Sequence, residues 1–392
     1  MARAKTVIGV QASILRWARE TANLSIGDVA KRLKKPEAVI EAWEAGEKSP
    51  TYPQLERLAY DLYKRPLALF FLPAPPDEPR AQTEFRSLPT DDLLSLDRDT
   101  IFLIRRARAF RFALEELYAK HSPVERPIWK EIVLSEASPL ESQAQAIRSS
   151  LGVSLEEQRD WPSPDHALKE WRRAIEARGV FVFKHAFKQR DISGFCLVDD
   201  EFPLIMVNNS TTKTRQIFSL LHELAHVLFH RSGISVFDDI RIESLPAQDR
   251  AIEKFCNAIA AEILVPLQDF RVATARWAPQ AASDEQYEEL AKRYHVSRAV
   301  ILRRFLDEGR VTRQFYRRKA EEWDSQRSQS AGEGGNYYAT QGAYLSETFV
   351  REVFSRYAKR LLSRDEAAEL IGVAPKNLSK LEDQILKGAQ AA

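Results

Sequence analysis

The sequence predicts an α+β protein that is mostly helical, and three observations lead to this fold class. Most of the 392-residue chain carries apolar side chains at the helical spacing i, i+3 and i+4. Three short apolar runs in the middle of the chain are typical of strands, namely VFVFK at 180–184, SGFCLVD at 193–199 and PLIMVN at 203–208. The two ends of the chain show only short helical patterns, broken by glycine and proline. We therefore expect a small three-stranded sheet inside a helical protein.

The composition is that of an ordinary globular protein. The chain is 44% hydrophobic and 29% charged, and its formal net charge is only +2, so overall charge does not argue for nucleic-acid binding. Its two cysteines, Cys196 and Cys256, match no disulfide or paired metal pattern, which suits a reducing compartment. The first residues lack the apolar region of a signal peptide, and no apolar run reaches the ~18 residues of a membrane span. We expect a cytoplasmic protein without a membrane partner.

Changes in composition divide the chain into four predicted domains. The proline-rich stretch LPAPPDEPR at 72–80 is typical of a stiff connector, and DSQRSQSAGEGGN at 324–336 is typical of a flexible linker. The expected domains are a helix-turn-helix bundle at 1–72, a connector with a helical segment at 73–160, a central domain at 161–323, and a linker with a helical carboxy-terminal domain at 324–392. The central domain includes a helix-turn-helix-like element at 285–306.

The central domain contains a metal-binding pattern on a predicted helix. The segment NSTTKTRQIFSLLHELAHVLFHRSG opens with Ser/Thr caps and closes at Gly233. Its His222 and His226 are four residues apart, so they share a helix face and can bind one tetrahedral zinc at ~2.0–2.1 Å. Glu223 lies about 100° around the helix, where it can take a proton from a water held by the metal. The alternative, a purely structural helix, is disfavoured because leucines and valines surround the triplet.

A catalytic zinc needs a third protein ligand. Glu253 is the best candidate, because it lies in the next predicted helix beside a buried stripe of isoleucines and near alanines that permit close packing. His230 is interpreted as a helix-end residue and Glu262 as a surface charge; Asp238, Asp239, Glu243 and Asp249 are further candidates. Asn257, one turn beyond Glu253, is either a hydrogen-bond partner of a ligand or an ordinary packing residue.

The motif and its surroundings resemble the ImmA/IrrE-type zinc metallopeptidases. HELAH is followed, 27 positions after His226, by the glutamate of EKFCNAIAAEILVP. RPLALFFLPAPP and TEFRSLP resemble the long members with an amino-terminal Xre-type domain, and GGNYYATQGAYLSETFV and GVAPKNL resemble their carboxy-terminal region. The resemblance covers most of the chain, with the metal motif its most specific part. It implies a zincin-like core, Zn²⁺ bound by His222, His226 and Glu253, and Glu223 as the general base.

The resemblance also implies a function. Members of the family cut, or are proposed to cut, repressors that carry helix-turn-helix domains, while other long members are encoded beside toxins. We therefore expect a zinc metallo-endopeptidase, latent until a signal arrives, that acts on a transcriptional repressor in a stress-response or mobile-element circuit. The alternative is a DNA-binding regulator, or an antitoxin with a cognate toxin, whose metal site is not proteolytic. Glu223 favours the peptidase, since a structural zinc site has no use for a general base.

The amino-terminal segment resembles an Xre-type helix-turn-helix, in which the second helix enters the major groove. Here that helix is PEAVIEAWEAG, with Glu37, Glu41 and Glu44 and no Arg, Asn or Gln for base contacts. Lys31, Arg32, Lys34 and Lys35 precede it. DNA binding and protein binding, to a toxin or a repressor, both remain open.

Two further segments have a helix-turn-helix-like pattern. The second helix of the element at 285–306 carries Arg298, Arg303 and Arg304, and the element either completes the peptidase domain or contacts DNA. The carboxy-terminal DEAAELIGVAPKNLSKLED is balanced in charge and suits an interaction or dimerisation module, so a homodimer is one alternative.

Overall fold

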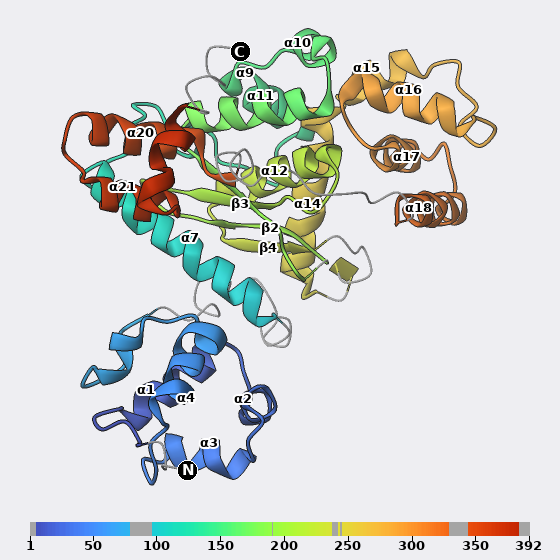
Figure 1. Cartoon of the computed structure of the whole chain (residues 1–392). Helices are drawn as coiled ribbons and strands as arrows, with labels where there is room; N and C mark the ends of the chain where they lie inside the picture. The colour runs from blue at the N-terminus through green and yellow to red at the C-terminus, as the bar shows by residue number, and fades with distance from the viewer. Residues whose placement is uncertain are drawn as a thin grey trace. The chain divides into compact units, whose positions relative to one another are not determined.

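The computed structural model describes residues 5–78, 96–189, 191–236, 242–243, 245–328 and 344–383 (Figure 1). Contacts within the chain divide it into two compact units, Met1–Arg106 and Ala107–Ala392. The helix α7, Arg98–Leu117, contains the boundary between them. Within the described residues, no helix combines the length and the apolar character needed to cross a membrane.

The first unit is a bundle of short helices, as predicted. It contains α1 (Ala12–Thr21), α2 (Ile26–Leu33), α3 (Glu37–Glu44), α4 (Tyr52–Glu56), the π-helix η1 (Arg57–Tyr63) and the 3-10 helix η2 (Leu67–Phe71). Ser25 and Asp28 form a capping box that starts α2, and Lys34 ends it in the left-handed conformation. The turn from Lys34 to Pro36 then leads into α3, which gives the helix-turn-helix arrangement.

The structure corrects the prediction for one carboxylate of α3. Ile40, Trp43 and Glu44 share the inner face of this helix, so Glu44 is buried instead of facing a groove. Its carboxylate accepts two hydrogen bonds from Arg19, at 2.7 and 2.9 Å. Glu37 and Glu41 are exposed. The face that α3 presents to solvent therefore carries two carboxylates, not three.

The second unit is built on a mixed four-stranded sheet, one strand more than predicted. The strands are β1 (Phe181–His185), β2 (Ile192–Leu197), β3 (Leu204–Asn208) and β4 (Gly233–Val236), in the order β1-β3-β2-β4. β1 and β3 are parallel, whereas β2 pairs antiparallel with both β3 and β4. The four residues of β4 begin shortly after the HELAH segment, and their first residue, Gly233, is typical of a helix end, so no strand was predicted there.

Helices cover both faces of the sheet. α11 (Pro164–Ala177) and α12 (Lys213–Leu228) pack on one face, together with α14 (Ala247–Leu264), which packs on α12 (Figure 1). On the other face, Phe183 of β1 stacks on Phe110 of α7 at 4.3 Å and contacts Phe349 of α20 (Glu347–Ala358) edge-on. Between α7 and α11 the chain forms the helices α8 (Ile128–Glu131), α9 (Leu140–Leu151) and α10 (Leu155–Asp160).

The helix with the histidine motif ends earlier than predicted. α12 stops at Leu228, not at Gly233, because Phe229 caps it and His230 adopts the left-handed conformation with φ 55°. The amide of Arg231 then donates to the carbonyl of His226, which closes the turn at 3.1 Å. His230 is thus a helix-end residue, as predicted, and Gly233 begins β4 instead of ending the helix.

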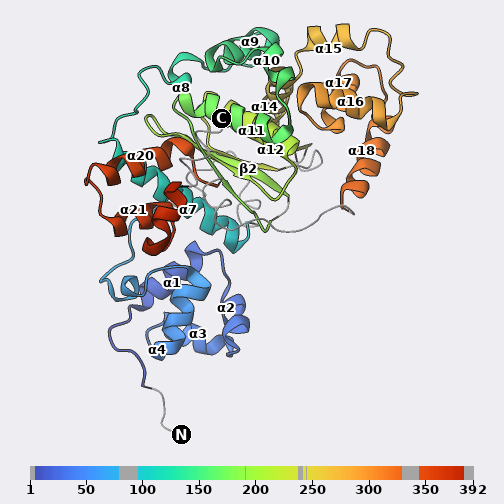
Figure 2. The same ribbon diagram turned by 45° about the horizontal axis from the view of Figure 1, so that its top comes forward.

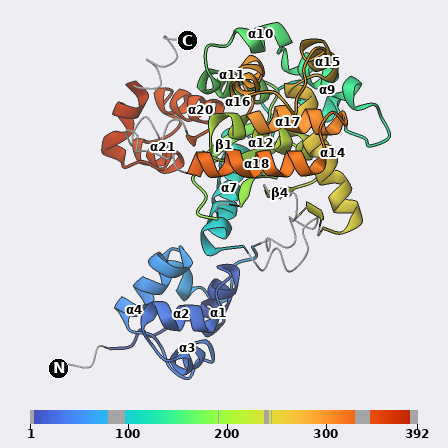
Figure 3. The ribbon, with the colours of Figure 1, turned by 90° about the vertical axis from the view of Figure 1, so that its right-hand side faces the viewer.

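A group of helices lies at one end of the sheet and the carboxy-terminal helices at the other (Figures 1 and 2). The first group contains α15 (Leu267–Ala273), α16 (Asp284–Tyr294), α17 (Arg298–Asp307) and α18 (Arg313–Ser328), and Figure 3 shows it from its own side. The second contains α20, α21 (Arg364–Ile371) and the 3-10 helix η3 (Pro375–Asn377). The predicted linker at 324–336 is helical up to Ser328, and its remainder lies outside the described residues.

The three arginines of α17, the second helix of the 285–306 element, have partners within the second unit. Arg304 is buried, and its guanidinium lies 2.7 Å from a carboxylate oxygen of Glu262 on α14. Arg298 pairs with Asp284 and Arg303 with Asp307. These contacts fit the interpretation that the element completes the central domain. They also correct the interpretation of Glu262, which is a buried ion-pair partner instead of a surface charge.

The outer edge of β1 is covered by the start of the carboxy-terminal segment. Two buried side chains of α11 make the connection: Arg172 donates to the carbonyls of Val182 and Leu345, at 3.1 and 2.8 Å. Glu176 accepts hydrogen bonds from the amide of Val182 and from the amide and hydroxyl of Thr348, at 3.2, 3.1 and 3.1 Å. These side chains satisfy strand groups that would otherwise be buried without partners.

Candidate metal centre

α12 carries the histidines into the interior of the second unit. Thr212 caps the helix by accepting a hydrogen bond from the amide of Arg215, and every residue from Ser219 to Leu228 is buried. His222 and His226 are 4% and 2% exposed, and Glu223 is fully buried. An apolar helix between a sheet and a second helix has no water to solvate these groups, so they require partners inside the protein.

Glu253 reaches the histidines from α14, which packs along α12. Ile252, Cys256 and Ile259 lie on the buried face of α14 that adjoins the core, and the small side chains of Ala260 and Ala261 directly follow Ile259. Glu253 itself is 8% exposed. Burial opposes ionisation of Glu253, but the adjacent imidazoles of His226 and His222 hold the pKa of its carboxyl well below the usual range.

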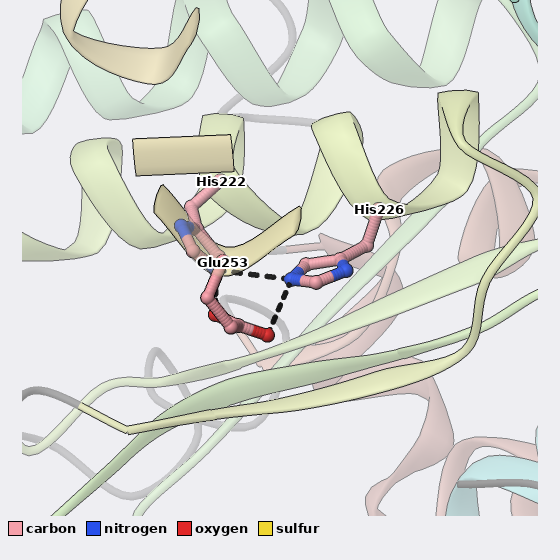
Figure 4. Close-up of side chains that lie close together, drawn as sticks. All are labelled: His222, His226 and Glu253. Carbon is pink, nitrogen blue, oxygen red and sulfur yellow. Dashed lines mark hydrogen bonds and ion pairs between the residues drawn. The ribbon is translucent and has the colours of Figure 1, made fainter. Parts of the chain in front are cut away.

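The three side chains converge on one point (Figure 4). The Nε2 atoms of His222 and His226 are 3.1 Å apart, and each lies 3.2 Å from one carboxylate oxygen of Glu253. In the described part of the chain, these residues form the group of His, Cys, Asp or Glu side chains whose ligand atoms are close enough to bind one metal ion.

The triangle has the size that a tetrahedral zinc requires. Ligand atoms bound at ~2.0–2.1 Å at tetrahedral angles are separated by about 3.3 Å, close to the observed 3.1 and 3.2 Å. Two imidazoles and one carboxylate are also a common donor set of catalytic zinc sites, which leave a fourth position open. The residues present therefore fit the metal, on distance and on donor chemistry.

Glu223 lies beside this triangle on α12. It is fully buried, and neither of its carboxylate oxygens has a hydrogen-bond partner that meets ordinary geometry among the described residues. Burial raises the pKa of the Glu223 carboxyl to about 8, against the opposing attraction of His222. A carboxyl whose pKa lies near neutrality is suited to accept and return a proton.

The other predicted ligand candidates do not reach the triangle. Glu243 is exposed and pairs with Lys254, while Asp249 lies 3.7 Å from Arg231. Asp238 and Asp239 lie outside the described residues. Glu262 is held by Arg304, as described above.

Asn257 is half-buried on α14, one turn beyond Glu253. No hydrogen bond joins it to the three converging side chains among the described residues. Its role as a hydrogen-bond partner of a ligand stays a prediction.

The sequence did not identify the strand residues beneath the site. A Cβ atom placed on Gly233 of β4 would lie 3.1 Å from Nδ1 of His226, and one on Gly194 of β2 would lie 3.3 Å from Oε1 of Glu223. Both glycines therefore make room for site side chains. Since β4 was not predicted, Gly233 was interpreted as the end of a helix.

Comparison with known protein families gave two matches. Residues 175–306 match a peptidase family described as the IrrE N-terminal-like domain. Residues 12–69 match a helix-turn-helix domain. A search of curated proteins found no match. The first match contains β1 to β4, α12 and α14, and therefore the whole candidate metal centre.

Proposed function

This chain is an ImmA/IrrE-type protein with an amino-terminal helix-turn-helix domain, and from this premise we propose that it is a zinc-dependent endopeptidase. The observation that carries the proposal is the triangle of His222, His226 and Glu253, with the buried carboxylate of Glu223 beside it. The substrate would be a protein, with a transcriptional repressor as the first candidate, in a stress-response or mobile-element circuit.

Three residues would bind the metal in this mechanism, and a fourth would transfer the proton. His222, His226 and Glu253 would hold the zinc, and the bound zinc would acidify water and polarise the carbonyl of a peptide bond. Glu223 would accept the proton of the attacking water and deliver it to the departing amine. Its buried position keeps bulk water from competing for that proton.

β4 is the preferred place for an extended substrate. An extended peptide can add to a free sheet edge through main-chain hydrogen bonds, which require no particular sequence. The β1 edge is covered by Arg172, Glu176 and the segment after Leu345. β4 is the opposite edge, it pairs with no other described strand on its outer side, and its Gly233 lies against His226.

The experiment that tests the proposal compares cells that express the wild type with cells that express Glu223→Gln. This substitution keeps the shape of the side chain but removes the base, so zinc binding and fold should persist. New protein amino termini, detected by mass spectrometry, should appear with the wild type alone. Identical termini in both strains, with and without stress, would reject the peptidase.

The alternative function is a DNA-binding regulator or an antitoxin, and the match of residues 12–69 to a helix-turn-helix domain favours it. Lys31 and Arg32 at the end of α2 and Lys34 and Lys35 in the turn are exposed and supply positive charge. Glu37 and Glu41 on α3 would repel phosphates. If α3 faces DNA, Glu41→Lys should strengthen binding to a random duplex several-fold at low salt, as measured by fluorescence anisotropy. Unchanged binding would instead favour a protein partner for this face.

A further inference from the structure

Four small residues of β2 and β4 lie in two opposite pairs. Gly194 pairs with Ser235, and Cys196 pairs with Gly233, in the antiparallel ladder between the two strands. Alternate residues of a strand point to the same face, so all four share one face of the sheet.

This face lies against the HELAH helix. A Cβ on Gly233 would approach the His226 ring at 3.1 Å, and a Cβ on Gly194 would approach Glu223 at 3.3 Å and the carbonyl of Met206 at 2.8 Å. A side chain on Gly194 would clash with the backbone, and one on Gly233 would crowd the His226 ring. In the pair formed by Gly194 and Ser235, which lies beneath Glu223, only Ser235 therefore has a side chain, and that side chain carries a hydroxyl group.

Ser235 and Glu223 are both buried with unsatisfied polar atoms. The Ser235 hydroxyl and both carboxylate oxygens of Glu223 have no hydrogen-bond partner that meets ordinary geometry within the described parts of the chain. A buried donor and a buried acceptor without partners each destabilise the fold, and a hydroxyl that rotates toward the carboxylate removes both penalties.

Hydrogen bonds hold the main chain of Ser235 in place, whereas its hydroxyl has no such bond among the described residues. The ladder shifts register between Ile192 and Gly194, and Ser193 at this irregularity donates its hydroxyl to the carbonyl of Ser235 at 3.1 Å. Bulges of this kind aim side chains beside functional sites. Rotation about the Cα–Cβ bond is thus the freedom left to the Ser235 side chain.

We propose that the Ser235 hydroxyl donates a hydrogen bond to the Glu223 carboxylate and orients it toward the metal centre. Ser235 is then a positioning residue for the base, and the facing glycines leave the space in which the two side chains meet. This inference rests on the proposed function, since orientation of Glu223 matters only if Glu223 moves a proton. Among the influences on the pKa of Glu223, burial is the largest and raises it, while Ser235 acts in the opposite direction.

The first test is a crystal structure of the zinc-loaded full-length protein. The proposal predicts that the Ser235 Oγ lies about 2.5–3.0 Å from a carboxylate oxygen of Glu223. A separation beyond about 3.5 Å would overturn it. This result does not depend on proteolysis, so it decides the inference even if the proposed function fails.

The second test uses Ser235→Ala with fluorescently labelled casein as the probe. The variant should keep about one zinc per chain and lose ~10-fold or more in kcat, because the base loses its orientation. KM should change little, because the contacts of the substrate stay intact. Ser235→Thr, which keeps a hydroxyl, should restore most of the rate. Wild-type kcat in Ser235→Ala would overturn the proposal, and lack of casein cleavage by the wild type would count against the proposed function alone.

Ser219→Ala is the matched control for this comparison. Ser219 is a buried serine of the same helix as Glu223, and its hydroxyl already donates to the carbonyl of Arg215 at 2.9 Å. Its substitution should leave kcat unchanged. An equal loss in Ser219→Ala would assign the effect to general loosening of the helix and overturn the specific role of Ser235.

Discussion

The polar triplet of α12 is costly unless something binds it. His222, Glu223 and His226 are almost completely buried among leucines, and a buried charge without a partner is strongly destabilising. The sequence already indicated that polar side chains would be buried here, because the H-E-x-x-H motif lies within a predicted apolar helix. It could not indicate Ser235 or Gly194, since their relation to Glu223 depends on strand pairing that no local pattern encodes.

The burial of Glu223 predicts a pH dependence for the stability of the metal-free protein. The pKa of this carboxyl rises from its ordinary value of 4.5 to about 8 in the folded state. Between these values the unfolded chain releases the proton while the folded protein keeps it, so stability falls as pH rises from about 5 to 8.

Glu223→Gln should remove this dependence. Urea unfolding at pH 5, 6.5 and 8, with chelator present, should give a slope that is less negative in the variant, by up to about 1.4 kcal/mol per pH unit. Equal slopes in the two proteins would show that Glu223 ionises normally when folded.

At the scale of the elements, long periodic helices were predictable and the short edge strand was not. α14 and the two helices of the 285–306 element occur where their patterns placed them. The misinterpretation of Glu262 has a physical reason. Its partner Arg304 is 42 positions away on α17, so only tertiary packing reveals that this helix-end carboxylate is buried.

The Arg304–Glu262 pair should stabilise the second unit. Arg304→Ala leaves the Glu262 carboxylate buried without its partner, so it should lower the free energy of unfolding by roughly 3–5 kcal/mol. The neighbouring Arg303→Ala removes a surface pair with Asp307 and a contact with the ring of Tyr316, so it should cost about 1 kcal/mol. Chemical denaturation measures both. Similar losses in the two variants would contradict the buried role of Arg304.

The hydrogen bonds of Glu176 at the outer edge of β1 should also contribute to stability. Glu176→Ala removes the acceptor of three hydrogen bonds, to Val182 and twice to Thr348, and should cost about 3 kcal/mol or more. Glu170→Ala on the same helix is the control, because its partners lie at the helix surface. Hydrogen exchange should show faster exchange of the Val182 and Thr348 amides in Glu176→Ala; unchanged exchange would mean that other contacts hold this segment.

At the scale of the whole molecule, the chain joins a helix-turn-helix unit to a unit with a candidate metal centre. The matches at 12–69 and 175–306 lie within the first and third predicted domains, and the domain division with its boundaries at 72, 160 and 323 stays a prediction. The carboxy-terminal helices belong to the same compact unit as the sheet. The sequence could not show this, because their attachment runs through side chains of α11.

Zinc should stabilise only the unit that holds its ligands. All three candidate ligands lie in the second unit, so zinc at 100 times its dissociation constant should add ~2.7 kcal/mol to that unit and raise its Tm by several degrees. Differential scanning calorimetry with zinc and with chelator measures the shift. A zinc-dependent shift that persists in His226→Ala would place the metal elsewhere.

A zinc titration of the metal-free full-length protein tests whether His222, His226 and Glu253 form one zinc site. We expect about one zinc per chain, with binding weakened at least ~100-fold by Glu253→Ala and nearly unchanged by Asp249→Asn one turn earlier on α14. No zinc binding by the wild type, or equal binding by Glu253→Ala, would contradict this site.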